Sequence, residues 1–96
     1  MSDTAPPTGA VARAIRSKLE AAFAPQRLVI VDESHLHAGH AGARAGGESH
    51  FRVEIVAQAF AGLSRIDRQR RINDVLAAEL AGPVHALSIQ AIAPAE

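Results

Sequence analysis

Histidine is the residue type in this sequence best suited to binding a metal, and three of the five histidines lie in one short segment. His35, His37 and His40 are separated by two and three positions, and the stretch from His35 to Glu48 also holds four glycines and four alanines. This composition favours a loop with few conformational restraints, which could deliver any of the three imidazoles to a metal. A solvated loop without a specific role explains the same pattern, so the spacing leaves the choice among them open.

The other two histidines lie beside segments with a regular apolar pattern. His85 follows Gly82-Pro83, a rigid turn that could present an imidazole at the start of a strand, where its neutral nitrogen can bind iron. A histidine with a structural role is the alternative. His50 is out of phase with Phe51, so it should point to the opposite face of a strand or to its edge. We expect His50 to be structural.

Composition narrows the chemistry further. The 96 residues include no cysteine, which excludes disulfides, thiolate catalysis and a self-contained cysteine-ligated cluster. Ten basic and ten acidic residues cancel, so any contact with nucleic acid must be local. The sequence has no Gly-x-Ser-x-Gly motif and no phosphate loop, and Asp32 and Glu33 are strand neighbours that point in opposite directions. We therefore expect no enzymatic activity.

Signals for membranes and targeting are missing as well. The first ten residues do not combine a charged region with an apolar one, and no apolar run approaches the roughly 20 residues that span a bilayer. Residues 1–8 hold two prolines and small polar residues, and we expect a disordered arm there. Residues 9–96 should form a single domain. We expect a cytoplasmic protein without membrane contact.

Apolar periodicity predicts the elements of that domain. Helical spacing runs from Val11 to Phe23, and a second helical pattern runs from Ile72 to Leu80 before Gly82-Pro83 ends it. Ile66 is out of phase with the second pattern, so a separate turn of helix should precede it. Three short apolar or alternating runs predict strands at Leu28–Val31, Phe51–Ile55 and Leu87–Ala91.

The order of these elements predicts the fold class. Helix, strand, strand, helix in one or two pieces, strand, or αββ(α)αβ, builds an α+β two-layer sandwich with helices on one face of a three-stranded mixed sheet. The last two strands are joined by a helical crossover and should be parallel, whereas the first two should be antiparallel.

Four blocks of this sequence, in the same order, resemble the BolA family. They are Val31-Asp32-Glu33-Ser34, Glu48-Ser49-His50-Phe51-Arg52-Val53, Phe60-Ala61-Gly62-Leu63-Ser64-Arg65 and Val84-His85-Ala86-Leu87-Ser88-Ile89. The resemblance covers about residues 11–94, and four ordered blocks are more specific than any single short motif. It implies a fold like the type II KH domain, in agreement with the order of elements.

The resemblance also implies a partner and a cofactor. BolA-like proteins pair with monothiol glutaredoxins and share a [2Fe-2S] cluster, with one cysteine ligand from glutaredoxin, one from glutathione and two ligands from the BolA-like chain. Here those two ligands map to His85 and to His37, with His40 as the neighbouring choice. The implied role is iron–sulfur trafficking or iron and redox sensing. We expect no cofactor in the isolated chain, which would be a monomer or a weak homodimer.

An alternative function follows from four arginines close together. Arg65, Arg68, Arg70 and Arg71 coincide with a segment that resembles a helix-turn-helix in the family, which implies phosphate contacts and a DNA-binding regulator of stress response or morphology. On an ideal helix Arg70 lies away from the other three, which share a sector of about 120° that overlaps the apolar face. Some arginine stems should therefore lie along the rim of the core. A solvated helix start is the simpler explanation.

Overall fold

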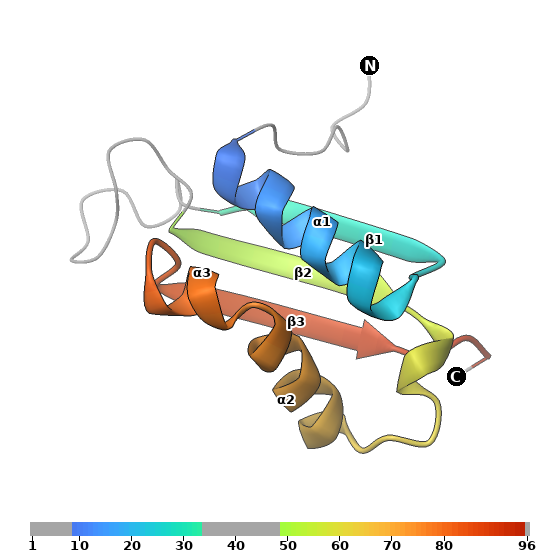
Figure 1. Ribbon diagram of the computed structural model, residues 1–96. Helices are drawn as coiled ribbons and strands as arrows, with labels where there is room; N and C mark the ends of the chain where they lie inside the picture. The colour runs from blue at the N-terminus through green and yellow to red at the C-terminus, as the bar shows by residue number, and fades with distance from the viewer. Residues whose placement is uncertain (1–8, 34–48, 96) are drawn as a thin grey trace.

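The structure is a computed structural model that describes residues 9–33 and 49–95 of the chain. The predicted arm at residues 1–8 and the histidines His35, His37 and His40 lie outside the described residues. The described elements (Figure 1) are α1 (Ala10–Phe23), β1 (Arg27–Asp32), β2 (His50–Val56), the 3-10 helix η2 (Gln58–Phe60), α2 (Arg65–Val75), α3 (Ala77–Ala81) and β3 (Ala86–Ile92).

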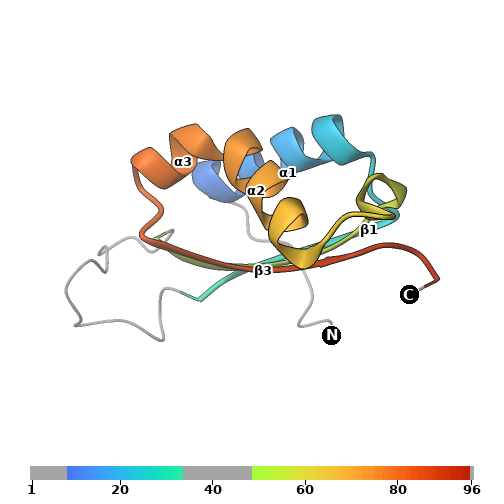
Figure 2. The same cartoon turned by 90° about the horizontal axis from the view of Figure 1, so that it is seen from below.

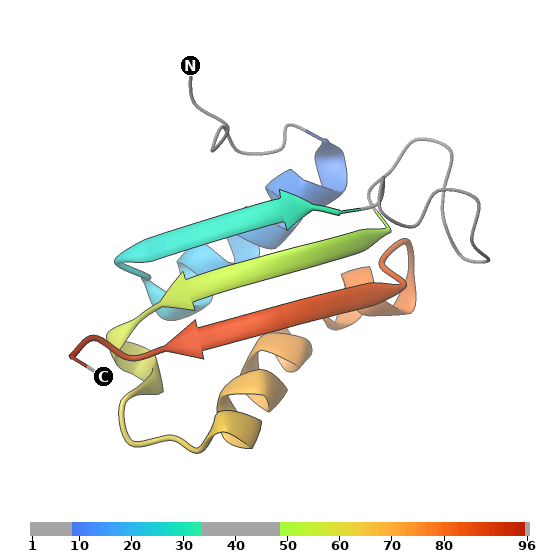
Figure 3. The ribbon, with the colours of Figure 1, turned by 180° about the vertical axis from the view of Figure 1, so that it is seen from behind.

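The three strands form one mixed sheet in the order β1-β2-β3. β1 pairs with β2 antiparallel, and β2 pairs with β3 parallel through a crossover that contains all of α2 and α3. The helices cover one face of this sheet (Figure 2). The opposite face carries no helix within the described ranges (Figure 3). The predicted α+β sandwich is confirmed.

Strand alternation directs the core to the helical face. On β2, Phe51, Val53 and Ile55 are buried while the residues between them are half-buried. Register continues this face onto the neighbouring strands, where Ile30 and Ile89 both pair with Val53. The helical layer contributes fully buried apolar side chains to the same core, at Ile15, Leu19, Phe60, Ile72 and Leu76.

The second helical region departs from the sequence prediction in one respect. Two pieces are present, but the break falls at Leu76, and Ile66 belongs to the same continuous helix as Ile72. The helix begins at Arg65 because the hydroxyl of Ser64 accepts the N–H of Asp67 at 3.1 Å. Ile66 breaks the apolar phase because the first turn of α2 extends past the core, leaving this residue 59% exposed. No helix in the described ranges is long and apolar enough to cross a membrane.

Candidate metal-binding end of the sheet

The two histidines that the structure describes meet at one end of the sheet. His50 is the first residue of β2 and His85 directly precedes β3. These strands are parallel, with His50 in register with Ala86, so their first residues lie at the same sheet end. The two imidazole ring centroids are 6.2 Å apart and the ring planes differ by 18°. The fold thus brings together two histidines that are separated by 34 residues in the sequence.

Ser49 links the two histidines. It is fully buried, and its carbonyl oxygen accepts the backbone N–H of His85 at 2.7 Å and that of Ala86 at 3.2 Å. Its hydroxyl lies 2.8 Å from Nδ1 of His50. Which partner donates depends on the tautomer of the imidazole, but in either case this contact orients the ring. We call Ser49, His50 and His85 the histidine end.

The turn before His85 is held by the helical layer. Gly82 ends α3, as the sequence predicts, and the N–H of Val84 then donates to the carbonyl of Glu79 at 3.0 Å. Val84 is buried at 4% exposure. The Glu79 carboxylate lies 2.7 Å from Nζ of Lys18 on α1. Backbone contacts on both sides therefore fix the position of His85 while its side chain stays exposed.

His50 lies on the sheet face without helices, as its phase with buried Phe51 predicts, and it is half-buried there. Imidazole suits iron, zinc, copper and nickel as a ligand. The described ranges contain no group of three or more histidine, cysteine, aspartate or glutamate side chains that could hold a metal ion. Within these ranges His50 and His85 are two imidazoles that lie close together, too few on their own to hold a metal ion.

The sequence analysis singled out some residues of this end of the sheet and missed others. His85 is exposed at a strand start, where its motif placed it. The ligand assignments to His37 and His40 concern residues outside the described ranges and stay predictions. Sequence reasoning passed over Ser49 and gave His50 only a structural role. The missing signal was the register between β2 and β3, which is what brings the two histidines together.

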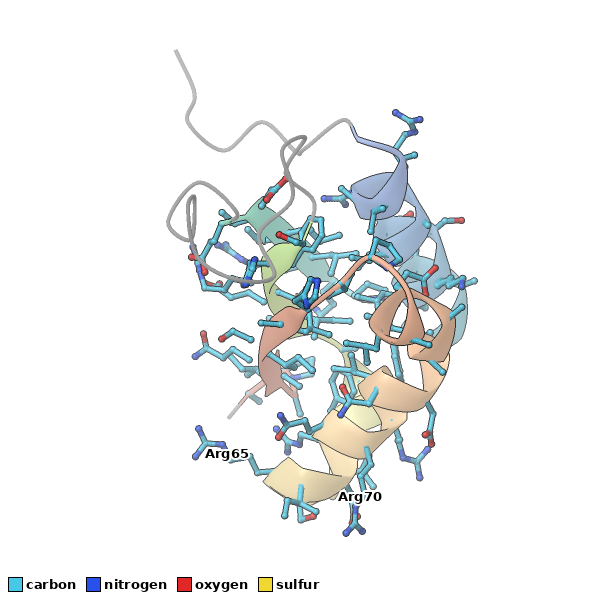
Figure 4. The ribbon with its side chains drawn as sticks, turned by 90° about the vertical axis from the view of Figure 1, so that its left-hand side faces the viewer. Arg65 and Arg70 are labelled. Atoms are coloured by element: carbon cyan, nitrogen blue, oxygen red, sulfur yellow. The ribbon has the colours of Figure 1, made fainter. Side chains whose placement is uncertain are left out.

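The arginines of helix α2 differ in their exposure and in their contacts. Arg68 is half-buried, and its guanidinium donates from Nε to the Leu63 carbonyl and from Nη1 to the Ala91 carbonyl, both at 3.0 Å. Arg70 lies 3.8 Å from Asp67 in an exposed ion pair. Arg65 and Arg70 point in different directions (Figure 4).

A groove with a volume of about 530 Å³ lies between the start of α2 and β3. Arg65 and Arg68 line it on the helix side, and Ile89 and Ile92 line it on the strand side. It adjoins the second half of β3, whereas His85 precedes the first residue of that strand. The groove and the histidine end are therefore separate features of the molecule.

Comparison with known proteins agrees with the resemblance. The family model described as BolA-like protein matches residues 19–96. BolA-like protein 1 of Mus musculus is 50% identical over 88 residues, which are 92% of this chain and 61% of the mouse protein, so the chain spans less than two thirds of that relative. A Sinorhizobium sp. protein described as lying in the cobS 5' region is 52% identical over 83 residues, covering 85% of this chain and 89% of that protein. The solved BolA domain of SufE1 from Arabidopsis thaliana superimposes with a TM-score of 0.84 and 44% identity, covering 93% of this chain and 98% of that domain.

Proposed function

The chain belongs to the BolA-like family, and from this premise we propose that it is a non-enzymatic partner of a monothiol glutaredoxin with which it holds a [2Fe-2S] cluster. The cluster is cargo that the pair carries or senses. Glutathione and the glutaredoxin supply thiolate ligands, which this chain lacks entirely. The occurrence of a BolA domain in a plant protein named SufE1 supports an iron–sulfur role for the domain.

One observation carries the proposal: the histidine end presents an exposed imidazole on a fixed backbone. The His85 N–H is bonded to the buried Ser49, yet the His85 side chain is exposed. An imidazole in this position can reach a metal held by a second protein without rearrangement of the fold. A ligand built for use inside one chain would instead be surrounded by other ligands of that chain.

The choice of nitrogen ligands favours transfer or sensing over storage. Replacing thiolates by imidazoles leaves a cluster less negative and raises its reduction potential. Imidazole is also protonated near neutral pH, which weakens its bond to iron. Both effects make such a cluster easier to reduce and to release.

The test is a pulldown with monothiol glutaredoxin in the presence of glutathione, followed by a visible absorption spectrum of the eluted complex. The matched variants are His85→Ala and Gln90→Ala, the second an exposed residue farther along β3. We expect His85→Ala to retain less than about a tenth of the cluster absorbance and Gln90→Ala to retain all of it. An unchanged spectrum and cluster lifetime in His85→Ala would contradict the proposal.

The DNA-binding alternative has weaker support. The chain has no net positive charge, and Arg68 is engaged with two backbone carbonyls. Nonspecific binding to nucleic acid depends on the number of cations that can neutralise phosphates. Arg65, Arg70 and Arg71 are exposed and are the residues of this segment that remain suited to that task.

A further inference from the structure

The outer edge of β3 has no neighbouring strand in the described ranges, and we propose that it binds an extended, acidic segment of a partner protein. The segment adds a fourth strand to the sheet and fills the groove between β3 and the start of α2. Extended peptides bind many proteins in this way, with backbone hydrogen bonds for affinity and side-chain pockets for specificity. The groove is separate from the histidine end, so this binding does not depend on the proposed function.

Backbone groups of alternate residues in β3 point away from β2. The N–H of Ala86 donates to the carbonyl of Ser49 at 3.2 Å, and the carbonyl of Ile92 accepts the N–H of Ala57 at 3.0 Å. Residues in phase with Ala86 and Ile92 therefore direct their N–H and C=O groups toward β2, and the residues between them direct these groups outward. The outward residues are Leu87, Ile89 and Ala91.

Arg68 covers the end of this edge and leaves its middle open. Nη1 of Arg68 donates to the Ala91 carbonyl at 3.0 Å, from the side away from β2. Among the described residues, none makes a hydrogen bond to the outward N–H or C=O of Leu87 or Ile89. Unpaired groups along an edge strand are a template for a further strand. The free length of edge is therefore centred on Leu87 and Ile89.

The groove beside this edge suits a segment that carries both apolar and acidic side chains. Leu63 and Ile89 line it, and both are half-buried at the rim of the core. Arg65 also lines it, is exposed, and points from the start of α2 toward the layer of the sheet (Figure 4). No acidic residue of the described ranges lines the groove. A carboxylate of the bound segment would therefore pair with Arg65.

Two other occupants fit this edge less well. Affinity for nucleic acid grows with the number of cations that neutralise phosphates, yet Arg65 is the one exposed arginine among the described residues that line the groove. A second copy of this chain would bring the same arginines to the edge again, without a described acidic side chain in its own groove to pair with them.

Amide hydrogen exchange in the full chain tests the strand pairing. The probe is a peptide of about eight residues that alternates valine and glutamate, and its control has the same composition in two blocks. We expect a saturating amount of the alternating peptide to slow exchange of the Leu87 and Ile89 amides at least tenfold. The amides of Ser88 and Gln90 already face β2 and should change less than twofold.

Two results of that experiment overturn the proposal. One is an unchanged exchange rate at both outward amides, or equal protection of them by the block peptide. The other is protection that grows with protein concentration when no peptide is present, which would assign the edge to a second copy of this chain.

Fluorescence anisotropy with the labelled alternating peptide tests the charge. We expect Arg65→Ala to weaken binding at least fivefold. Arg27→Ala is the matched control, because it removes the same charge from an exposed side chain on β1, at the opposite edge of the sheet, and should change the affinity less than twofold. Equal weakening by the two substitutions overturns the proposal. Displacement of the peptide by single-stranded DNA at a lower concentration than by unlabelled peptide also overturns it, and would assign the groove to nucleic acid.

Discussion

At the histidine end, a buried hydroxyl and backbone groups make the contacts that hold the fold, whereas at helix α2 a charged side chain makes them itself. Ser49 bonds to the backbone of His85 and to the ring of His50, and the His85 side chain stays exposed. Arg68 instead ties the loop before α2 to β3 through two carbonyl contacts. A polar side chain committed to the fold is less available to a partner, so the first region is better arranged for binding than the second.

The largest expected effect on stability comes from removing the contacts of Arg68. Hydrogen bonds from a charged group contribute about 1.5–3 kcal/mol, and Arg68 makes two of them while half-buried. We expect Arg68→Ala to lower the free energy of unfolding by about 2 kcal/mol, measured by urea denaturation. Arg70→Ala is the matched control on the same helix and should change it by less than about 0.5 kcal/mol, because its side chain is 75% exposed. Equal effects of the two substitutions would remove the contrast between the regions.

The next largest effect on stability is expected at the histidine end, from removing the hydroxyl of Ser49. Ser49→Ala keeps the backbone carbonyl that binds His85 and removes only the hydroxyl contact to His50. We expect a loss of about 1 kcal/mol in the free energy of unfolding, the usual size for one buried hydrogen bond. The position of His85 should be unchanged, as seen in its backbone amide chemical shift, while the imidazole signals of His50 broaden or move. A large shift of the His85 amide would mean that the hydroxyl, not the carbonyl, holds this end together.

Much of the fold follows from local patterns in the sequence. Alternation at Phe51, Val53 and Ile55 identifies β2 and the face that it buries, and Gly82 marks the end of α3. These patterns depend on neighbours within a few residues, which the sequence contains. The sequence prediction placed the break between the two helical pieces too early, and the structure has it at Leu76. The first turn of α2 is exposed, so the pattern of apolar residues does not show where this helix begins. Ser64, the N-cap, carried that signal.

The candidate site was less predictable because it depends on pairing between distant segments. His85 could be singled out from its turn and its motif, and the parallel pairing of β2 and β3 was predicted, but the sequence does not give the register that pairs His50 with Ala86. The role of Arg68 was hidden for the same reason, since its acceptor on Ala91 lies 23 positions away. Residue type indicates what a side chain can bind, whereas tertiary pairing decides whether it is already bound.

A smaller effect on stability is expected at His85. Its side chain is exposed and its backbone N–H bond survives truncation, so His85→Ala should change the free energy of unfolding by less than about 0.5 kcal/mol. Urea denaturation of the variant alone, beside the cluster measurement on its complex, separates the two roles. A loss of 2 kcal/mol would show that this imidazole contributes to the fold as Arg68 does, and the contrast would fail.

The smallest effects are expected in DNA binding, where the comparison predicts which arginines of α2 do not contribute. The logarithm of affinity falls with the logarithm of salt concentration with a slope of about 0.9 per neutralised phosphate, so the three exposed arginines Arg65, Arg70 and Arg71 together account for a slope of at most about 2.7. Replacing those three with alanine should flatten the salt dependence of duplex binding by no more than this amount. Arg68→Ala, assayed where the variant is folded, should leave the slope unchanged, because in the unsubstituted chain the Arg68 guanidinium is bonded to the carbonyls of Leu63 and Ala91 and not to a phosphate. Fluorescence anisotropy between 50 and 200 mM salt, a range over which such slopes are resolved, measures both variants. A slope that falls by about 0.9 in Arg68→Ala would place that guanidinium on a phosphate and return the residue to the binding surface.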